Sequence, residues 1–244
     1  MCTLSWLESP GGYELFMNRD ELRQRLPAGP PEIHLGSRSA FLAPTDGDAG
    51  GSWIAVNEHG LGLALLNRYD HAPRIDCERL RSRGLLVTDL ATRCDEAAGV
   101  LRALSDLDLE FYRAFTLALF EPGDSPQAVA WNGRQLSAPW RPVQPLASSS
   151  YDPDGIGEAR RRCAEQLLGP KASREDLLAF HRSHAPERGP YSPCMHREDA
   201  ATVSFTWVQV TSEEVAMAYA DGPPCRSALA PALTLARHAA KIPA

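Results

Sequence analysis

The sequence lacks the features that mark several large classes of protein. None of its apolar runs approaches the ~20 residues that a helix needs to cross a bilayer. The segment from Met1 to Leu7 has neither a basic start nor a long apolar run, so it does not predict a secretory signal. The net charge is −6 and both signs are mixed along the chain, which argues against nucleic acid as a partner. We therefore expect a cytoplasmic protein with no membrane span.

Cysteine motifs are also missing. The six cysteines have no paired spacing, and neither CxxC nor CxxCH occurs, so zinc-ribbon, thioredoxin-like and covalently attached haem sites lose their strongest support. In a chain without a secretory signal, the cysteines are expected to be reduced thiols. Four of them are expected to be small buried apolar side chains, namely Cys77, Cys94, Cys163 and Cys225.

What is present indicates one layered α+β domain over residues 1–244. The 43% hydrophobic content can bury a full core, and no linker or repeat divides the chain. Blocks of strands and blocks of helices alternate, which favours a layered arrangement over repeated βαβ units. Strands are predicted at 2–8, 13–17, 52–57, 61–66, 115–120, 127–131, 202–210 and 215–219. Helices are predicted within 78–104, interrupted near a cap at Asp95, and at 156–168 and 173–184.

Three local patterns carry more specific expectations. The stretch containing Pro27, Pro30, Pro31 and Pro44 predicts a loop. Asn132-Gly133 is typical of a type I′ hairpin turn. The run Arg160-Arg161-Arg162 is expected to lie on a solvated helix face, as most short charge runs do.

Cys2 is the most informative residue. Met1 is usually removed when a small residue follows it, and removal leaves a thiol and a free α-amine on one residue. An α-amine with a pKa of ~7.7–8.0 has the right strength to take a proton from a thiol of pKa ~8.5. Cys2 would then supply both the nucleophile and the general base.

A predicted hairpin brings a polar motif back beside Cys2. The turn at Gly11-Gly12 joins two strands of similar length, so Asn18-Arg19-Asp20-Glu21 returns next to the start of the first strand. Adjacent strand residues face opposite sides of a sheet. Arg19 and Asp20 can therefore both reach Cys2 only if a bulge or the strand end intervenes. Taken by itself, the motif favours a surface turn with a local ion pair that contributes ~0–1 kcal/mol.

Several motifs follow one another in order along the chain. They are Met1-Cys2-Thr3, Asn18-Arg19-Asp20-Glu21, Gly51-Ser52-Trp53-Ile54, Leu66-Asn67, Ser148-Ser149-Ser150 and Cys194-Met195-His196. In these motifs the sequence is similar to the NRDE-motif family, also called the transport-and-Golgi-organisation protein 2 family. A more distant likeness, over Val56–Leu61 and Leu66-Asn67, is to bile-salt hydrolases and penicillin V acylases. Both likenesses imply the N-terminal-nucleophile fold, a four-layer αββα sandwich with largely antiparallel sheets.

The resemblance implies four catalytic roles. Cys2 matches the nucleophile, Arg19 the arginine that stabilises its thiolate, Asp20 the partner of the α-amine, and Asn67 the donor to the oxyanion. A second asparagine of the acylases is replaced by the run of serines at 148–150, and Arg197 is a guess for their late arginine. Asn67 by itself is equally explained as a residue that ends a strand, and Trp53 and Trp131 are expected in the core.

Two functions remain open, and the first is a ligand carrier. The NRDE family is associated with intracellular trafficking of haem and with acyl-CoA or lipid handling. That association makes haem the expected carried ligand, with acyl-CoA or lipid as the alternative and the delivery partner unknown. The residues expected to contact it are Asn18, Arg19, Glu21 and Ser149, with Cys2, Cys194 and His196 as candidate axial ligands of haem iron.

The second function is an N-terminal cysteine amidohydrolase acting on a non-peptide amide bond, and a third is a scaffold whose active site is vestigial. Of the two main functions, we favour the carrier from the sequence.

No resident metal is expected, although His181 and His184, at helical spacing, are a minority alternative as zinc ligands with Cys194 and His196.

Overall fold

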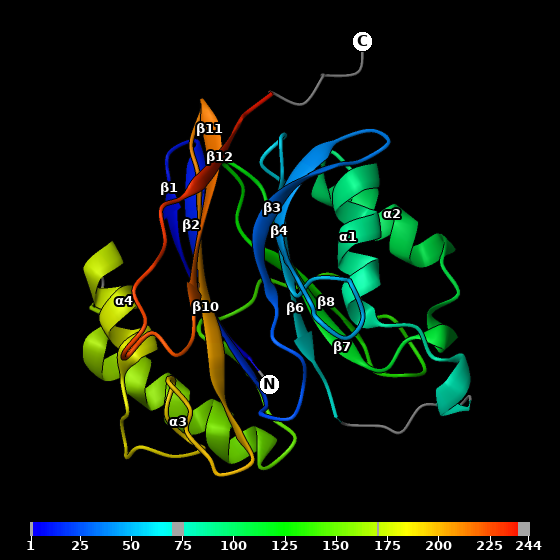
Figure 1. Ribbon diagram of the computed structural model, residues 1–244. Coiled ribbons are helices and arrows are strands. Elements are labelled where there is room, and N and C mark those ends of the chain that lie inside the picture. The colour runs from blue at the N-terminus through cyan, green and yellow to red at the C-terminus, as the bar shows by residue number, and fades with distance from the viewer. Residues whose placement is uncertain (1, 70–75, 170, 239–244) are drawn as a thin grey trace.

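The computed structural model describes residues 2–69, 76–169 and 171–238. Two six-stranded sheets face each other, with one pair of helices on each outer face (Figure 1). The first sheet has the order β12-β11-β10-β2-β1-β9 and the second has the order β3-β4-β5-β6-β7-β8. Neighbouring strands pair antiparallel throughout both sheets. The four-layer αββα sandwich expected from the sequence is therefore confirmed.

The element bounds follow the predicted blocks. The first sheet contains β1 (Cys2–Ser9), β2 (Gly12–Leu22), β9 (Leu146–Ser148), β10 (Ala200–Val210), β11 (Glu214–Asp221) and β12 (Leu233–Ala236). The second contains β3 (Gly29–Leu35), β4 (Ala40–Thr45), β5 (Ile54–Asn57), β6 (Gly62–Asn67), β7 (Phe115–Phe120) and β8 (Gln127–Trp131). The helices are α1 (Arg83–Arg93), α2 (Ala97–Asp106), α3 (Pro153–Leu167) and α4 (Arg174–Arg182), with 3-10 turns η1 (Cys77–Arg79) and η2 (Leu109–Phe111).

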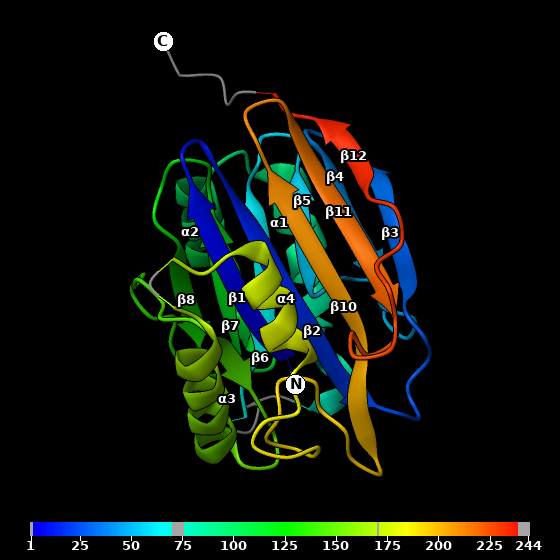
Figure 2. The ribbon, with the colours of Figure 1, turned by 90° about the vertical axis from the view of Figure 1, so that its left-hand side faces the viewer.

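Apolar side chains of β1 and β2 fill the space between the sheets. Leu4, Leu15 and Met17 are fully buried there against Ile54 and Leu66 of the second sheet. The opposite face of the first sheet is covered by α3 and α4 (Figure 2). Each strand of the central hairpin is thus buried on both faces, which explains the weak alternation of apolar and polar residues in β2.

Three local predictions are wrong. The Pro-rich stretch forms β3 and β4, because Pro30 and Pro31 lie in an edge strand, where a missing N–H is tolerated. Asp95 does not cap α2, because the N-cap of that helix is Glu96. The Asp95 carboxylate instead accepts a hydrogen bond from Ser39. Asn132-Gly133 is not a type I′ turn, because Asn132 has a negative φ and its side chain accepts from the next backbone N–H groups in a wider loop.

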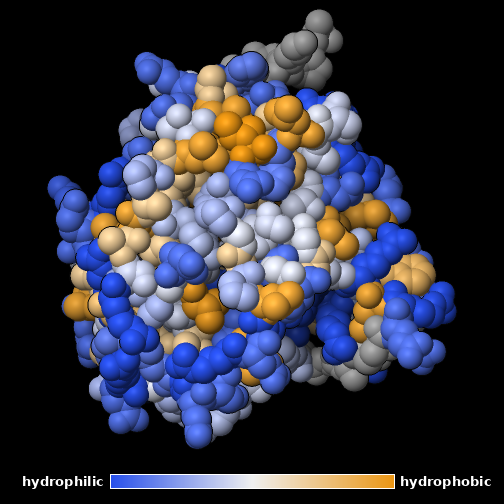
Figure 3. Space-filling view, in the orientation of Figure 1, coloured by the Kyte–Doolittle hydropathy of each residue, from blue (hydrophilic) through white to orange (hydrophobic). Residues whose placement is uncertain are grey.

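The described helices include none that is long and apolar enough to span a bilayer. The face in Figure 3 is mainly hydrophilic, with apolar side chains gathered in small separate patches.

Candidate functional site

Cys2 lies at the start of β1 between two partner strands. Its Cα is paired with Arg19 of β2 on one side and with Ser148 of β9 on the other. The Cys2 backbone nitrogen donates to Ser148 Oγ at 3.1 Å. Directly opposed residues in an antiparallel pair share a face, so the Cys2 and Arg19 side chains both point between the sheets. Met1 lies outside the described residues.

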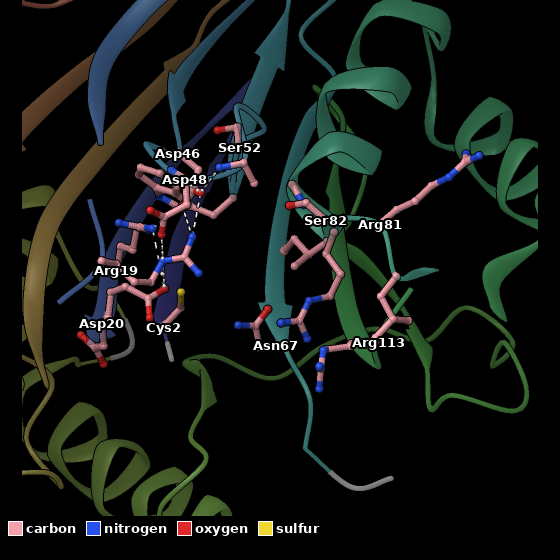
Figure 4. Close-up of a pocket in the computed structure, with 18 residues that line it drawn as sticks. Cys2, Arg19, Asp20, Asp46, Asp48, Ser52, Asn67, Arg81, Ser82 and Arg113 are labelled. Atoms are coloured by element: carbon pink, nitrogen blue, oxygen red, sulfur yellow. Dashed lines mark hydrogen bonds and ion pairs between the residues drawn. The ribbon is translucent and has the colours of Figure 1, made fainter. Parts of the chain in front are cut away.

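A cavity of about 370 Å³ opens at this end of the sandwich. Cys2, Arg19 and Asp20 lie on one side of it, and Asn67 and Arg113 lie across from them (Figure 4). Five arginines and four carboxylates contribute to its wall, together with Trp53 and a few small or apolar side chains. The charged lining residues are Arg19, Arg25, Arg81, Arg83, Arg113, Asp20, Glu21, Asp46 and Asp48.

Arg19 is held by several partners rather than by Cys2 alone. Its guanidinium donates to Asp46 and lies 4.5 Å from the centre of the Trp53 ring. Asp46 also accepts from Arg25 at 2.8 Å, and Glu21 is 3.7 Å from Arg19. Trp53 is buried as expected, but it also supports the guanidinium. The pairing with Asp46 offsets part of the positive charge that Arg19 presents to the cavity.

Asp20 faces the other side of the sheet. It is fully buried and accepts from Arg160 of α3 at 3.0 Å and from Thr202 of β10 at 2.6 Å. A bulge in β10 between Thr202 and Ser204 lies opposite Arg19 and Asp20. This bulge does not bring the two side chains to one face, because β1 and β2 pair in unbroken register and β2 continues to Leu22. Asp20 nevertheless contributes to the cavity wall.

Arg160 was missed by the sequence analysis. The prediction that the run at 160–162 is solvated is wrong for Arg160, which is 1% exposed and also donates to Thr3 Oγ1 and, at 3.5 Å, to the Cys2 carbonyl. Arg197, the guess for the late arginine of the acylases, pairs with Asp199 and is not among the residues that line the cavity. The sequence does contain a pattern that indicates burial of Arg160, because this residue shares a helix face with the apolar residues Ile156 and Cys163.

The other predicted ligand-binding residues divide into two groups. Glu21 lines the cavity, whereas Asn18, Ser149, Cys194 and His196 are not among its lining residues. The Asn18 side chain is fully buried towards the helices and donates to the carbonyls of His181 and Pro193 at 3.0 and 2.8 Å. Ser148, rather than Ser149, contacts Cys2.

Asn67 ends β6 on the opposite wall. It lines the cavity, and its side-chain amide is 3.5 Å from the Tyr69 hydroxyl. Figure 4 shows the Asn67 amide on the wall that faces Cys2. An amide in this position can donate to a carbonyl oxygen of a molecule that occupies the cavity.

Burial governs the protonation of Cys2. It raises the pKa of the Cys2 thiol above its ordinary value, and Asp20 adds to this rise, whereas Arg19 opposes it. The thiol is therefore mainly protonated at neutral pH, and reaction as a nucleophile requires a base beside it. The Cys2 nitrogen that Ser148 holds is the nearest such group once it is a free amine.

Comparison with solved structures identifies the fold. A variant of the conjugated bile acid hydrolase from Clostridium perfringens matches with a TM-score of 0.60 and 11% identity, covering 99% of both chains. The N-acylethanolamine-hydrolyzing acid amidase ortholog of Caenorhabditis elegans matches with a TM-score of 0.59 and 12% identity, over 85% of this chain and 92% of that one. Penicillin V acylase from Agrobacterium tumefaciens matches with a TM-score of 0.54 and 9% identity, over 89% and 82%. These likenesses show the N-terminal-nucleophile hydrolase fold.

Sequence comparison identifies the family. No curated protein matches the chain. The model of the family described as Transport and Golgi organisation 2 matches residues 1–153, which include Cys2, the motif at 18–21, Asn67 and the serines at 148–150. The chain belongs to the Transport and Golgi organisation 2 family.

Proposed function

We propose that this protein, after removal of Met1, is an N-terminal cysteine hydrolase that cleaves an amide bond in a small substrate carrying an anionic group. The observation that carries the proposal is the arrangement around Cys2. Its nitrogen is held by Ser148 Oγ, its side chain lines the cavity, and Asn67 lies on the opposite wall. The shared fold with bile acid, N-acylethanolamine and penicillin V hydrolases supports it.

The chemistry follows from these positions. The Cys2 α-amine takes the thiol proton, and the sulfur attacks the amide carbonyl carbon. The Asn67 amide N–H stabilises the oxyanion, an interaction that contributes about 2.7–4 kcal/mol in other enzymes. The protonated α-amine then gives its proton to the leaving nitrogen as the C–N bond breaks. Water, deprotonated by the same amine, hydrolyses the resulting thioester and regenerates the thiol.

The charged wall favours an anionic substrate. Arg83 and Arg113 line the cavity on the wall that carries Asn67. The Arg81 side chain points away from the cavity (Figure 4), and its guanidinium lies 5.6 Å from the centre of the Phe111 ring. A carboxylate, sulfonate or phosphate on the substrate would be oriented by guanidinium donors at that wall.

The test compares chains that differ only at the N-terminus. One sample retains a fusion partner directly before Cys2, and a second is cut so that Cys2 is the first residue. Both are incubated with N-acylated glycines and taurines, and the released amine is measured. Only the cut sample should turn over substrate, because a peptide nitrogen has no basic lone pair. Cys2→Ala in the cut chain should be inactive, whereas Cys94→Ala, which changes a cysteine beside α1, should remain active. Equal turnover by the fused and cut chains would refute this mechanism.

A second candidate, the carrier of an amphipathic anion such as haem or acyl-CoA, is favoured by the same wall with Arg83 and Arg113. Among the described residues that line the cavity, Cys2 is the one with a sulfur or imidazole ligand for haem iron. Haem titration should then give a saturable Soret shift that Cys2→Ser alters and His196→Asn does not. Binding of palmitoyl-CoA without release of free CoA would support the acyl-CoA carrier. The absence of saturable binding of either ligand would exclude this candidate.

A further inference from the structure

A second group of chemically active side chains lies away from the cavity, on the side of the first sheet that the helices cover. His184 follows α4, Cys194 and His196 lie in the loop before β10, and Cys225 lies in the loop after β11. Their ligand atoms all lie within 4.8 Å of one another. Three separate segments of the chain meet at this point, near the lower end of α4 in Figure 2.

Three of the six separations among the ligand atoms match the edges of a coordination tetrahedron, and the other three are at most 4.8 Å. Zn–N bonds of about 2.0–2.1 Å and Zn–S bonds of about 2.3 Å imply N···N edges of about 3.3 Å and N···S edges of about 3.6 Å. The His184 and His196 Nε2 atoms are 3.2 Å apart. The Sγ atoms of Cys194 and Cys225 are 3.6 and 3.5 Å from His196 Nε2. A side-chain adjustment on the order of 1 Å closes the longest separation to a tetrahedral edge.

Hydrogen bonding does not account for this convergence. His196 Nε2 lies within contact distance of three heavy atoms, one nitrogen and two sulfurs. A neutral imidazole nitrogen carries either one hydrogen or one lone pair, so it can satisfy one of these contacts. A cation at the centre of the four atoms accepts a lone pair from each and explains all the contacts together.

We propose that His184, Cys194, His196 and Cys225 bind one zinc ion in a closed tetrahedral site. Two thiolates and two imidazoles are the donor set that zinc takes in structural sites, and four protein ligands leave no position for a substrate or water. The site is therefore structural. It crosslinks the end of α4, the loop before β10 and the loop after β11.

Backbone contacts prepare the loop for this role. The Cys194 N–H donates to the Ser183 carbonyl at 3.0 Å, and the Ser192 hydroxyl donates to the Cys194 carbonyl at 2.7 Å. The His196 N–H donates to the Gly189 carbonyl at 3.2 Å. Such outer contacts orient metal ligands before the ion arrives.

The site is also linked to the buried polar network behind Cys2. Met195, between two ligands, donates its N–H to Thr202 Oγ1 at 2.8 Å, and Thr202 donates to Asp20 at 2.6 Å. Zinc would thus hold in place the segment that leads to Thr202, one of the partners of Asp20.

The sequence analysis considered a zinc site but included the wrong histidine. His181 is fully buried, its Nε2 lies 2.7 Å from Ser5 Oγ, and its ring stacks on Phe16. Cys225, expected to be a buried apolar side chain, is partly exposed beside His196. Cys94 and Cys163 are buried as expected, and the side chain of Cys77 lies outside the described part of the structure.

The experiment measures metal in the full chain, produced without a polyhistidine tag. Mass spectrometry of the elements should find about one zinc per chain. Cys225→Ser and His184→Asn, both in surface loops, should lose the zinc. Cys94→Ser, on the far side of the molecule, should keep it.

Cobalt keeps the test decisive if a variant folds poorly. Co²⁺ added to the metal-free chain under reducing conditions should produce the absorption bands of a tetrahedral thiolate site. These bands should be present in Cys94→Ser and absent in Cys225→Ser. Three results would each overturn the proposal. These are no zinc and no cobalt bands in the unsubstituted chain, zinc retained at full stoichiometry in Cys225→Ser, and a Cys194–Cys225 disulfide in the freshly isolated protein.

Discussion

The two faces of the hairpin formed by β1 and β2 perform different tasks, although their residues alternate along the same strands. The face between the sheets carries Cys2 and Arg19 into a cavity lined by charged residues. The face towards α3 and α4 carries Asn18 and Asp20 into a network that is fully buried. The strand period of two therefore divides the hairpin between a cavity face, which carries Cys2 and Arg19, and a structural face, which carries Asn18 and Asp20. A motif at an active site need not consist only of residues that contact the substrate.

The largest expected effect is on the structural face. Arg160→Met should lower the free energy of unfolding by about 3–5 kcal/mol, because it leaves the Asp20 carboxylate buried without its cation. Arg162→Met, on the same helix, removes a surface pair with Glu158 and should cost less than ~1 kcal/mol. Urea unfolding of both variants tests the contrast. Equal losses would mean that the buried pair does not stabilise the fold.

The two asparagines should separate stability from activity. Asn18→Ala removes two hydrogen bonds from buried carbonyls and should cost about 2 kcal/mol of unfolding free energy. Asn67→Ala should leave stability within about 0.5 kcal/mol. If the proposed hydrolysis is correct, it should lower kcat by about 10²–10³-fold. Thermal unfolding and turnover of the cut chain provide both measurements. A stable but inactive Asn18→Ala variant would contradict the division between the faces.

Acid should weaken the structural face through His181. Burial, with the nearby charge of Arg160, lowers the pKa of His181 from 6.5 to about 3. The unfolded chain binds this proton at higher pH than the folded chain does. Stability from His181 is therefore present above pH 6.5 and is lost as the pH falls towards about 3, by up to ~1.4 kcal/mol per pH unit. Urea midpoints between pH 7 and pH 5 should fall less steeply for His181→Gln than for the unsubstituted chain. Parallel curves would exclude His181 as the source.

The smallest effect is expected on the cavity face. Asp46→Asn removes a carboxylate that pairs with Arg19, so more of the guanidinium's positive charge acts on Cys2. The pKa of the Cys2 thiol, which burial raises, should move downwards. Alkylation by iodoacetamide at pH 7.5 should then be faster by a few-fold. Asp48→Asn changes a carboxylate that pairs with Arg25 and should leave the rate unchanged. A slower reaction in Asp46→Asn would show that Asp46 acts by positioning Arg19 rather than by offsetting its charge.

Local patterns predicted more of the fold than of the site. The hairpin at Gly11-Gly12 and the apolar strand ending at Asn67 gave the arrangement of Cys2, Arg19 and Asn67 around one end of the sandwich. The same patterns missed Arg160, because three successive arginines resemble a solvated face unless the apolar spacing of the helix is weighed against them. They indicated the serine run at 148–150 but did not fix that Ser148 pairs with Cys2, since a register of one residue decides which serine lies opposite it.

The sequence by itself determined a layered α+β protein and the return of the 18–21 motif to Cys2, both of which depend on periodicity and turn residues. The order of its motifs determined the family, and the αββα layering was what that resemblance implied. Only the tertiary structure decided which residues of the motif face the cavity, which arginine holds Asp20, and that His184, Cys194, His196 and Cys225 meet. Those outcomes depend on strand register and on contacts between segments far apart in the chain, and neither is encoded in the spacing of any one segment.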